Sequence, residues 1–273
     1  NGKSASKEVS VSQQANSVTY AVTDVTLAAP ADIPASGGSV SSTTVTAKGS
    51  QTYTSGSVTS DVSLTNGSDD CTITFSEGVS AASLGTTVTN RTKKGTLTAT
   101  VTWKTTATKS ASVDVYQAAN TATYGDITFD SAVATEISFK ADGTQSRNMT
   151  DNSYVGAKQT VTYTSGATRT EASDTAAVVL NLSPKVKTAA TGFALSSDGI
   201  VSVGANPNTE PRGGFVVTVT VTGEGSKTAT RDFTFSQQGS SSYISLTPES
   251  LTFVAAGESK TLTIESNDSW TLE

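Results

Sequence analysis

The segment FVVTVTVT, residues 215–222, decides the fold class of this 273-residue chain. Successive side chains of a β-strand point to opposite faces, so Phe215 and three valines share one face while the threonines share the other. The segment LTATVTW, residues 97–103, repeats the pattern with Leu97 and Trp103 on its apolar face. Both segments are predicted to be half-buried strands. Because no segment shows helical periodicity, the whole chain is expected to be all-β.

Each of these strands is followed by a polar turn and a second strand, which predicts two β-hairpins. The second strands end in VYQ at residues 115–117 and FSQ at residues 235–237. A third copy of this closing segment, VSVSQQ at residues 9–14, has no hairpin partner before it. The three copies lie 104 and then 120 residues apart, so they indicate a repeated unit slightly longer than one hundred residues.

A second internal match supports the repeat. QTYTSGS at residues 51–57 resembles VTYTSGA at residues 161–167, with a tyrosine ending a strand before each Ser-Gly turn. Many short strands at this period predict tandem immunoglobulin-like β-sandwiches. The predicted parts are the closing strand of a preceding module at 1–18, complete modules at 19–120 and 121–240, and the start of a further module at 241–273.

The incomplete modules at the two ends allow two interpretations. The chain is either a window on a longer protein, or neighbouring molecules complete its ends by adding strands. The two fragments together supply only part of one sandwich, which favours the window.

Composition excludes several classes of function. The net charge is −6 and no Lys- and Arg-rich stretch is interleaved with aromatics, so no nucleic-acid partner is expected. No run of about 20 apolar residues could span a bilayer, so no direct membrane insertion is expected. The single cysteine, Cys71, allows no internal disulfide and is expected to be a small core residue.

The chain contains no histidine, which removes the commonest general base and metal ligand. The nearest approach to paired carboxylates is Asp69 with Asp70 and Glu171 with Asp174, all in turn-like sequence, and these are expected to be solvated loop charges. Carboxylates in sandwich loops could still bind calcium, although no EF-hand spacing is present. We therefore expect a non-enzymatic protein with no cofactor and no metal site.

Carbohydrate-binding sites usually need exposed aromatic rings that stack on sugar faces. Trp103 continues the inward face of its strand, so it is expected to be a core residue. Tyr154, in the loop DNSYVG, is the candidate for stacking on a sugar.

The C-terminal segment SLTPESLTFVAAGESKTLTIESNDSWTL, residues 245–272, resembles the opening of a BACON domain, an immunoglobulin-like module of Bacteroidetes surface proteins and some of their phages. The residues that carry the resemblance are Pro248, Leu251, Phe253, Gly257, Ser266, Asn267 and Trp270. The resemblance implies that Trp270 packs in the core of this last module. The complete modules resemble the wider set of Bacteroidetes immunoglobulin-like repeats through residues 201–222 and 115–120, but they lack the SNxSW element of the last segment.

The resemblance implies an extracellular protein of a bacterial cell surface or a phage virion, in which tandem modules act as a spacer, stalk or adhesion segment. Two alternatives stay open: a module that binds carbohydrate such as mucin or another glycan, and a subunit of a phage fibre or pilus-like assembly that pairs with neighbouring subunits. Proteins of this kind can be O-glycosylated at Asp-Ser/Thr followed by a small residue. The triplets DSA and DTA therefore make Ser131 and Thr175 candidate modification sites.

Overall fold

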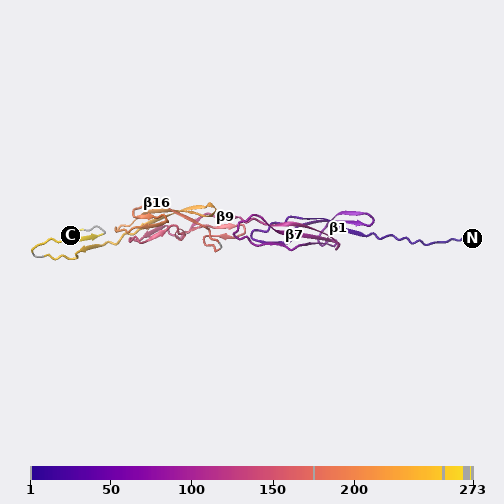
Figure 1. Ribbon diagram of the computed structural model, residues 1–273, viewed down its shortest axis with the longest axis horizontal. Helices are drawn as coiled ribbons and strands as arrows, with labels where there is room; N and C mark the ends of the chain where they lie inside the picture. Colours follow the sequence, from indigo (N-terminus) through magenta and orange to yellow (C-terminus); the bar gives the residue numbers. More distant parts are fainter. Residues whose placement is uncertain (1, 175, 254–255, 267–270, 272–273) are drawn as a thin grey trace. The chain divides into compact units, whose positions relative to one another are not determined.

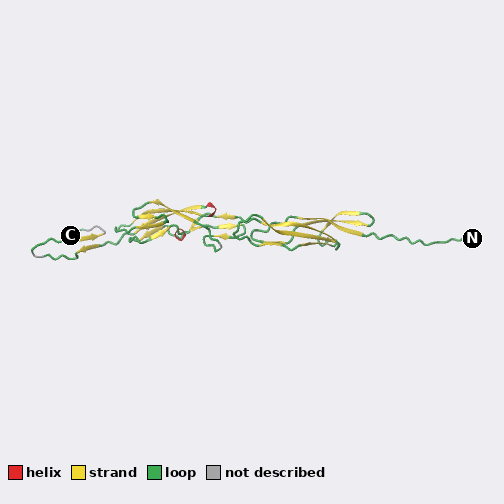
Figure 2. Ribbon diagram, viewed as in Figure 1, coloured by secondary structure: helices red, strands yellow, loops and turns green. Residues whose placement is uncertain are grey.

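The computed structural model describes residues 2–174, 176–253, 256–266 and 271, and its regular structure is almost entirely β (Figure 1; Figure 2). Strands take up 48% of the residues and helix 3%, which confirms the all-β prediction. The chain divides into two compact units. Unit 1 consists of residues 1–122 and 163–167, and unit 2 consists of residues 123–162 and 168–273.

The strands of unit 1 are antiparallel and form sheets of order β1-β3-β4, β5-β7-β8 and β2-β6. Their bounds are β1 Val18–Leu27, β2 Gly38–Val40, β3 Val45–Tyr53, β4 Val58–Leu64, β5 Cys71–Phe75, β6 Val79–Ala81, β7 Thr92–Trp103 and β8 Ala107–Gln117. The predicted hairpin is formed by β7 and β8, which pair from Thr92↔Gln117 to Trp103↔Ala107.

The alternation in LTATVTW does what the sequence predicts. Leu97, Ala99, Val101 and Trp103 are all fully buried, and Trp103 packs in one core with Cys71, Val25 and Ala47. On the opposite face the hydroxyl groups of Thr98 and Thr100 bond to those of Ser112 and Ser110 across the hairpin, at 2.9 and 2.8 Å. Burial on one face and hydroxyl pairs on the other hold the register of this hairpin.

The remaining strands form sheets of order β11-β20-β19-β16, β12-β18-β17, β10-β13 and β15-β14-β9. Their bounds are β9 Ala122–Tyr124, β10 Thr128–Phe129, β11 Glu136–Phe139, β12 Ser146–Asn148, β13 Ala157–Lys158, β14 Val161–Tyr163, β15 Thr168–Arg169, β16 Asn181–Thr188, β17 Phe193–Leu195, β18 Ile200–Val203, β19 Arg212–Thr222 and β20 Thr228–Gln237. Two short helices, α1 (Asn152–Val155) and the 3-10 turn η1 (Glu224–Ser226), lie in loops. The pairing of β11 with β20 is parallel, and β20 pairs with β19 as the second predicted hairpin.

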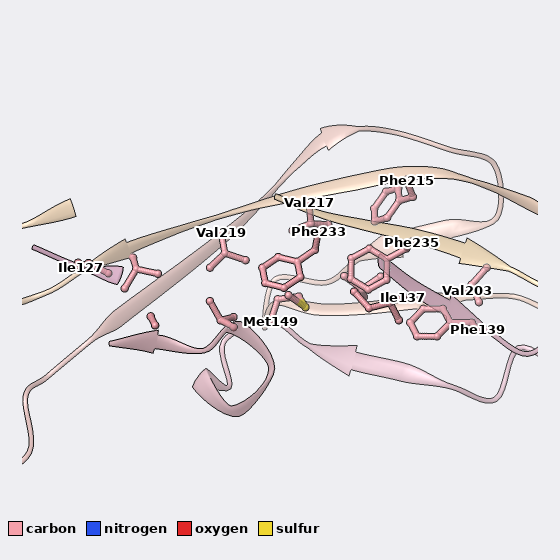
Figure 3. Close-up of a cluster of buried hydrophobic side chains, with 14 residues drawn as sticks. Ile127, Ile137, Phe139, Met149, Val203, Phe215, Val217, Val219, Phe233 and Phe235 are labelled. Atoms are coloured by element: carbon pink, nitrogen blue, oxygen red, sulfur yellow. The ribbon is translucent and has the colours of Figure 1, made fainter. Parts of the chain in front are cut away.

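The core of unit 2 is rich in phenylalanine. Phe215, Phe233 and Phe235 come from the β19–β20 hairpin and are buried against Met149 and Ile137 (Figure 3). The rings of Phe193 and Phe215 stack with their centroids 5.4 Å apart. Each unit therefore buries a hydrophobic core of its own, as the alternating segments predict.

The segments near the two ends of the chain expose apolar side chains. Val9 and Val11 are 78% and 91% exposed and lie in no strand, so their prediction as part of a closing strand stays a prediction. Near the other end, β21 (Ile244–Thr247) and β22 (Thr263–Ser266) form an antiparallel hairpin with exposed apolar residues. None of the helices in the described part of the chain has the length and apolar character that a membrane crossing needs.

Candidate functional site

The candidate sugar-stacking residue, Tyr154, lies on the one-turn helix α1. Its side chain is 38% exposed, and the guanidinium carbon of Arg147, on β12, lies 4.4 Å from the centroid of its ring. A cation so close to a tyrosine face is attracted by the ring's quadrupole. One ring face is therefore covered by Arg147, and a sugar could stack only on the other face or after Arg147 moves.

Local hydrogen bonds hold the loop that carries Tyr154. The Asp151 carboxylate accepts the backbone N–H of Ser153 at 2.9 Å, which caps the helix. Hydrogen bonds from the Ser153 side chain and from this N–H lower the pKa of Asp151. The Asn152 side chain bonds to both backbone groups of Ala157, and Gly156 ends the helix with φ of 69°. These hydrogen bonds hold the backbone on both sides of Tyr154 in one conformation.

The two predicted modification sites have different outcomes. Ser131 is exposed in the turn after β10, where its hydroxyl is accessible. The neighbouring Asp130 carboxylate bonds to Lys158 at 2.8 Å and to the N–H of Ala132 at 2.9 Å, and these contacts lower its pKa. Thr175 lies outside the described residues, so its modification stays a prediction.

The predicted acidic pairs are not arranged for acid–base chemistry. Lys104 binds both Asp69 and Asp70, with N–O distances of 2.5 and 3.0 Å, and these contacts raise the pKa of Lys104 and lower that of Asp69. The N–H of Trp103 also donates to Asp69. Asp69 and Asp70 are therefore ion-paired loop residues that close the end of the β7–β8 hairpin.

The two carboxylates of the second acidic pair, Glu171 and Asp174, have different surroundings. A Glu171 carboxylate oxygen accepts the N–H of Gln159 at 3.3 Å, whereas Asp174 is exposed. Within the part of the chain that the structure describes, no group of three or more potential metal-ligating residues comes together.

Two residues singled out for chemistry belong to the core. Cys71 is buried, and burial raises the pKa of its thiol. Trp103 is fully buried with Tyr20 against it edge-to-face, at a centroid distance of 5.0 Å. Trp270, the other tryptophan, lies outside the described residues.

A shallow hollow of about 300 Å³ lies in unit 1 between the ends of β3, β4 and β5. Val45, Leu64, Ile73 and Phe75 make its apolar wall. Asn66 lies at its rim and accepts the N–H of Ile73 at 2.8 Å, so its carbonyl oxygen is already used. The hollow has one aromatic residue in its wall and no charged residue to orient a ligand.

The closing strands carry a polar feature that the sequence reasoning missed. Gln117 and Gln237 are fully buried at the ends of β8 and β20. The Gln117 amide donates to the carbonyls of Pro34 and Ala82 at 3.2 and 2.8 Å. The signal for this role was a glutamine at an inward-facing strand position in both copies of the repeat.

Gln237 makes the equivalent contacts in unit 2. Its amide donates to the carbonyls of Lys140, Ala141 and Gly204 at 3.0, 3.2 and 2.9 Å. Its carbonyl oxygen accepts a hydrogen bond from the Nε–H group of Arg212 at 2.7 Å. In each unit, one buried glutamine therefore fastens two loops beside the closing strand.

Asparagines bind the two repeated Tyr-Thr-Ser-Gly turns. In the first asparagine cluster, defined as Asn16, Thr54 and Ser55, the Asn16 carbonyl oxygen accepts the Thr54 hydroxyl at 3.0 Å and the Ser55 N–H at 3.2 Å. The turn glycine, Gly56, has φ of 87°.

The second asparagine cluster consists of Asn120, Thr164 and Ser165, which all belong to unit 1. The Asn120 carbonyl oxygen accepts the Thr164 hydroxyl at 3.0 Å and the Ser165 N–H at 2.9 Å. Its turn glycine, Gly166, has φ of 86°. The two clusters therefore have the same internal geometry.

No protein-family model matches the chain, and no curated protein is similar enough in sequence to count as a relative.

Proposed function

We propose that this chain is a non-enzymatic structural segment made of immunoglobulin-like modules, which acts as a spacer or stalk in an extracellular surface or virion protein. The observation that carries the proposal is the repetition of one structural plan in two units, each with its own core and its own loop-fastening glutamine. Repetition of a self-contained module is how proteins build length.

The strand pairing supports the immunoglobulin-like assignment. In unit 2, β11 pairs in parallel with the closing strand β20, so that Phe139 lies opposite Gln237. In unit 1, Ile33 makes the corresponding parallel bridge to Gln117. A first strand that crosses to the closing strand, within otherwise antiparallel sheets, suits the two-sheet sandwich. The resemblance of residues 245–272 to a BACON domain points to the same class of surface protein.

Mechanical unfolding of single molecules tests the spacer role. Pulling the chain from both ends should give two separate unfolding events, each releasing about 100 residues or roughly 35 nm of chain. A Cβ atom at Gly49, in unit 1, would lie 2.5 Å from the ring of Trp103, so Gly49→Ala should lower the force of one event and leave the other unchanged. A single event that releases the whole chain would contradict a modular spacer.

Glycan binding is a second candidate, favoured by the exposed pair Tyr154 and Arg147. A ring with an adjacent guanidinium offers stacking and hydrogen bonds to sugar hydroxyls. The test is a glycan array with the intact chain, Tyr154→Ala, and Tyr124→Ala as the matched control, since Tyr124 is 37% exposed. Binding that is lost only in Tyr154→Ala supports this function, and absence of binding by the intact chain removes it.

Assembly into a fibre or pilus-like structure is a third candidate, based on the exposed apolar residues of the end segments, Val11 and Ile244 among them. Sedimentation of the chain in dilute solution tests it. Concentration-dependent association that Val11→Ser weakens would support strand exchange between copies, and a monomer at all concentrations would argue against it.

A further inference from the structure

The two asparagine clusters of unit 1 differ in the hydrogen-bond partners of their asparagine amide and serine hydroxyl groups. In the second cluster the Asn120 amide donates to the carbonyls of Gly85 and Thr87 at 3.0 and 2.8 Å, and the Ser165 hydroxyl also donates to Gly85. Asn120 is fully buried by these contacts. The second cluster thus binds the loop that contains Gly85 and Thr87 through three hydrogen bonds.

The first cluster has the same donor groups, but they bind no loop in the part of the chain that the structure describes. The amide nitrogen of Asn16 and the hydroxyl of Ser55 have no hydrogen-bond partner among residues 2–174, 176–253, 256–266 and 271, and both residues are exposed. Because equivalent groups make the same two internal bonds in both clusters, these donors lie where their counterparts at the second cluster bind a loop.

The residues before each asparagine also correspond. Val9, Val11 and Gln13 occupy the positions that Val113, Val115 and Gln117 occupy before Asn120. Val115 and Gln117 are fully buried on β8, whereas Val11 is 91% exposed. Residues 9–13 therefore have the apolar alternation and the glutamine of a closing strand, but all five residues are exposed.

Geometry within unit 1 shows why the strand and the loop come together. The backbones of Asn120 and Thr89 exchange two hydrogen bonds of 3.0 Å each, so the loop that carries Gly85 and Thr87 lies beside the residues that follow β8. A module closed by residues 9–13 would hold its own equivalent loop beside Asn16 in the same way.

We propose that the first asparagine cluster is a docking surface for another β-sandwich module of the same kind, closed by residues 9–13 and located before unit 1 in the full-length protein. Asn16 and Ser55 would donate to two backbone carbonyls of that module's loop, as Asn120 and Ser165 do to Gly85 and Thr87. This contact is independent of whether the modules serve as a spacer or bind a glycan.

The test supplies such a module. A chimera with residues 17–116 placed directly before Gln13 gives Gln13 a sandwich to close and places a loop equivalent to 84–87 beside Asn16. Stability is measured by urea unfolding for the parent chain, the chimera and their Asn16→Asp variants. Asn16→Asp keeps the acceptor oxygen and removes the amide donor, and it is not duplicated in the chimera.

In the parent chain, Asn16→Asp should leave the unfolding equilibrium unchanged, while Asn120→Asp should shift it toward unfolding about tenfold or more, because a buried side chain loses its two hydrogen bonds to carbonyls and places a carboxylate beside them. In the chimera, Asn16→Asp should have the large effect as well. An Asn16→Asp effect as small in a folded chimera as in the parent would overturn the proposal.

A second chimera covers the case in which the first does not fold. Residues 17–120 placed directly before Ser17 keep the natural junction, with Asn120 in the place of Asn16. Ser55→Ala in the following module should then destabilise this chimera about tenfold and leave the parent unchanged, as expected for the loss of one hydrogen bond. No difference between the two chains would overturn the proposal.

Sedimentation of the parent chain separates the proposed occupant from a second copy. A monomer supports a module within the same protein. A dimer that Asn16→Asp dissociates would assign the surface to a second copy and overturn the proposal.

Discussion

Single buried polar residues bring distant segments of each unit together. Gln237 bonds to carbonyls of Lys140 and Gly204, which are 97 and 33 residues away in the sequence. Each of these carbonyls also accepts a second donor, the N–H of Gly143 for Lys140 and a terminal nitrogen of Arg212 for Gly204, so the glutamine amide adds a further bond to each. Replacing Gln237 by an apolar residue leaves each carbonyl with one donor fewer and removes several hydrogen bonds of a buried amide, each of which contributes about 1 kcal/mol.

Gln237→Leu should therefore destabilise unit 2. Three carbonyls lose a donor and Arg212 loses an acceptor, so we expect a loss of about 2 to 4 kcal/mol in the free energy of unfolding. Urea unfolding measures it, and Gln238→Leu, at the exposed neighbouring position, is the control. Equal stability of the two variants would contradict the role assigned to Gln237.

Gly49 is required by close packing. A Cβ atom at this position would lie 2.5 Å from the ring of Trp103. Gly49→Ala should push the ring out of place and cost about 1 to 3 kcal/mol, measured as a lower urea midpoint. Gly204→Ala is the control, since a Cβ there meets no atom within 4 Å. An unchanged midpoint for Gly49→Ala would show that the Trp103 core tolerates the extra methyl group.

At the scale of elements, the β7–β8 and β19–β20 hairpins both end in a buried glutamine, but the glutamine has a different cross-strand partner in each. Gln237 pairs across the strands with Arg212, whose Nε donates to the glutamine carbonyl oxygen. Gln117 pairs with Thr92, and its carbonyl oxygen is buried without a hydrogen-bond partner among the described residues. The cross-strand partner of the glutamine is therefore an arginine in unit 2, which satisfies the glutamine oxygen. In unit 1 the partner is a threonine, and the glutamine oxygen has no donor among the described residues.

Thr92→Arg should transfer that contact to unit 1. A donor for a buried acceptor contributes about 1 kcal/mol, so the urea midpoint of unit 1 should rise. Thr92→Lys, which cannot place a donor like Nε, is the control. A midpoint that falls in Thr92→Arg, or that rises equally in both variants, would contradict the equivalence of the two hairpins.

An ion pair links β15 to η1. Both terminal nitrogens of Arg169 donate to the Glu224 carboxylate, at 2.9 and 2.5 Å, and the two side chains are only 13% and 22% exposed. Arg169 lowers the pKa of Glu224 below its ordinary value of 4.5. The stabilisation is therefore present above that ordinary value and is lost as the pH falls through the lowered pKa.

Glu224→Gln should lower stability at pH 7 by about 1 to 3 kcal/mol, because charge-assisted hydrogen bonds are lost, and the difference from the parent chain should shrink in acid. Unfolding at pH 7 and pH 3 measures it. Asp61→Asn, which removes an exposed ion pair with Lys48, is the control and should change stability by less than about 1 kcal/mol. A difference that persists in acid would exclude ionisation as its cause.

At the scale of the whole molecule, unit 2 buries one hydrophobic cluster and unit 1 buries two, and no cluster contains residues of both units. Separate cores allow separate cooperative transitions. Scanning calorimetry should show two transitions, with Gly49→Ala lowering one and Gln237→Leu lowering the other. One transition that both variants shift together would mean that the units unfold as one.

The sequence by itself determined which faces of the strands are buried. Alternation in LTATVTW and FVVTVTVT is a local property of the backbone, so Trp103 and Phe215 could be placed in the cores without knowing their partners. The repeat could be recognised for the same reason, since copies of one module repeat one local pattern.

Only the tertiary structure decided what the polar residues bind. The partners of Gln237 and Asn120 lie tens of residues away, and no local periodicity reports which loop reaches a side chain after folding. Tyr154 could be predicted to be exposed, but the cover provided by Arg147 depends on how β12 packs beside α1. Burial follows from a pattern along the chain, whereas hydrogen bonding depends on which distant segments folding brings within about 3 Å of each other.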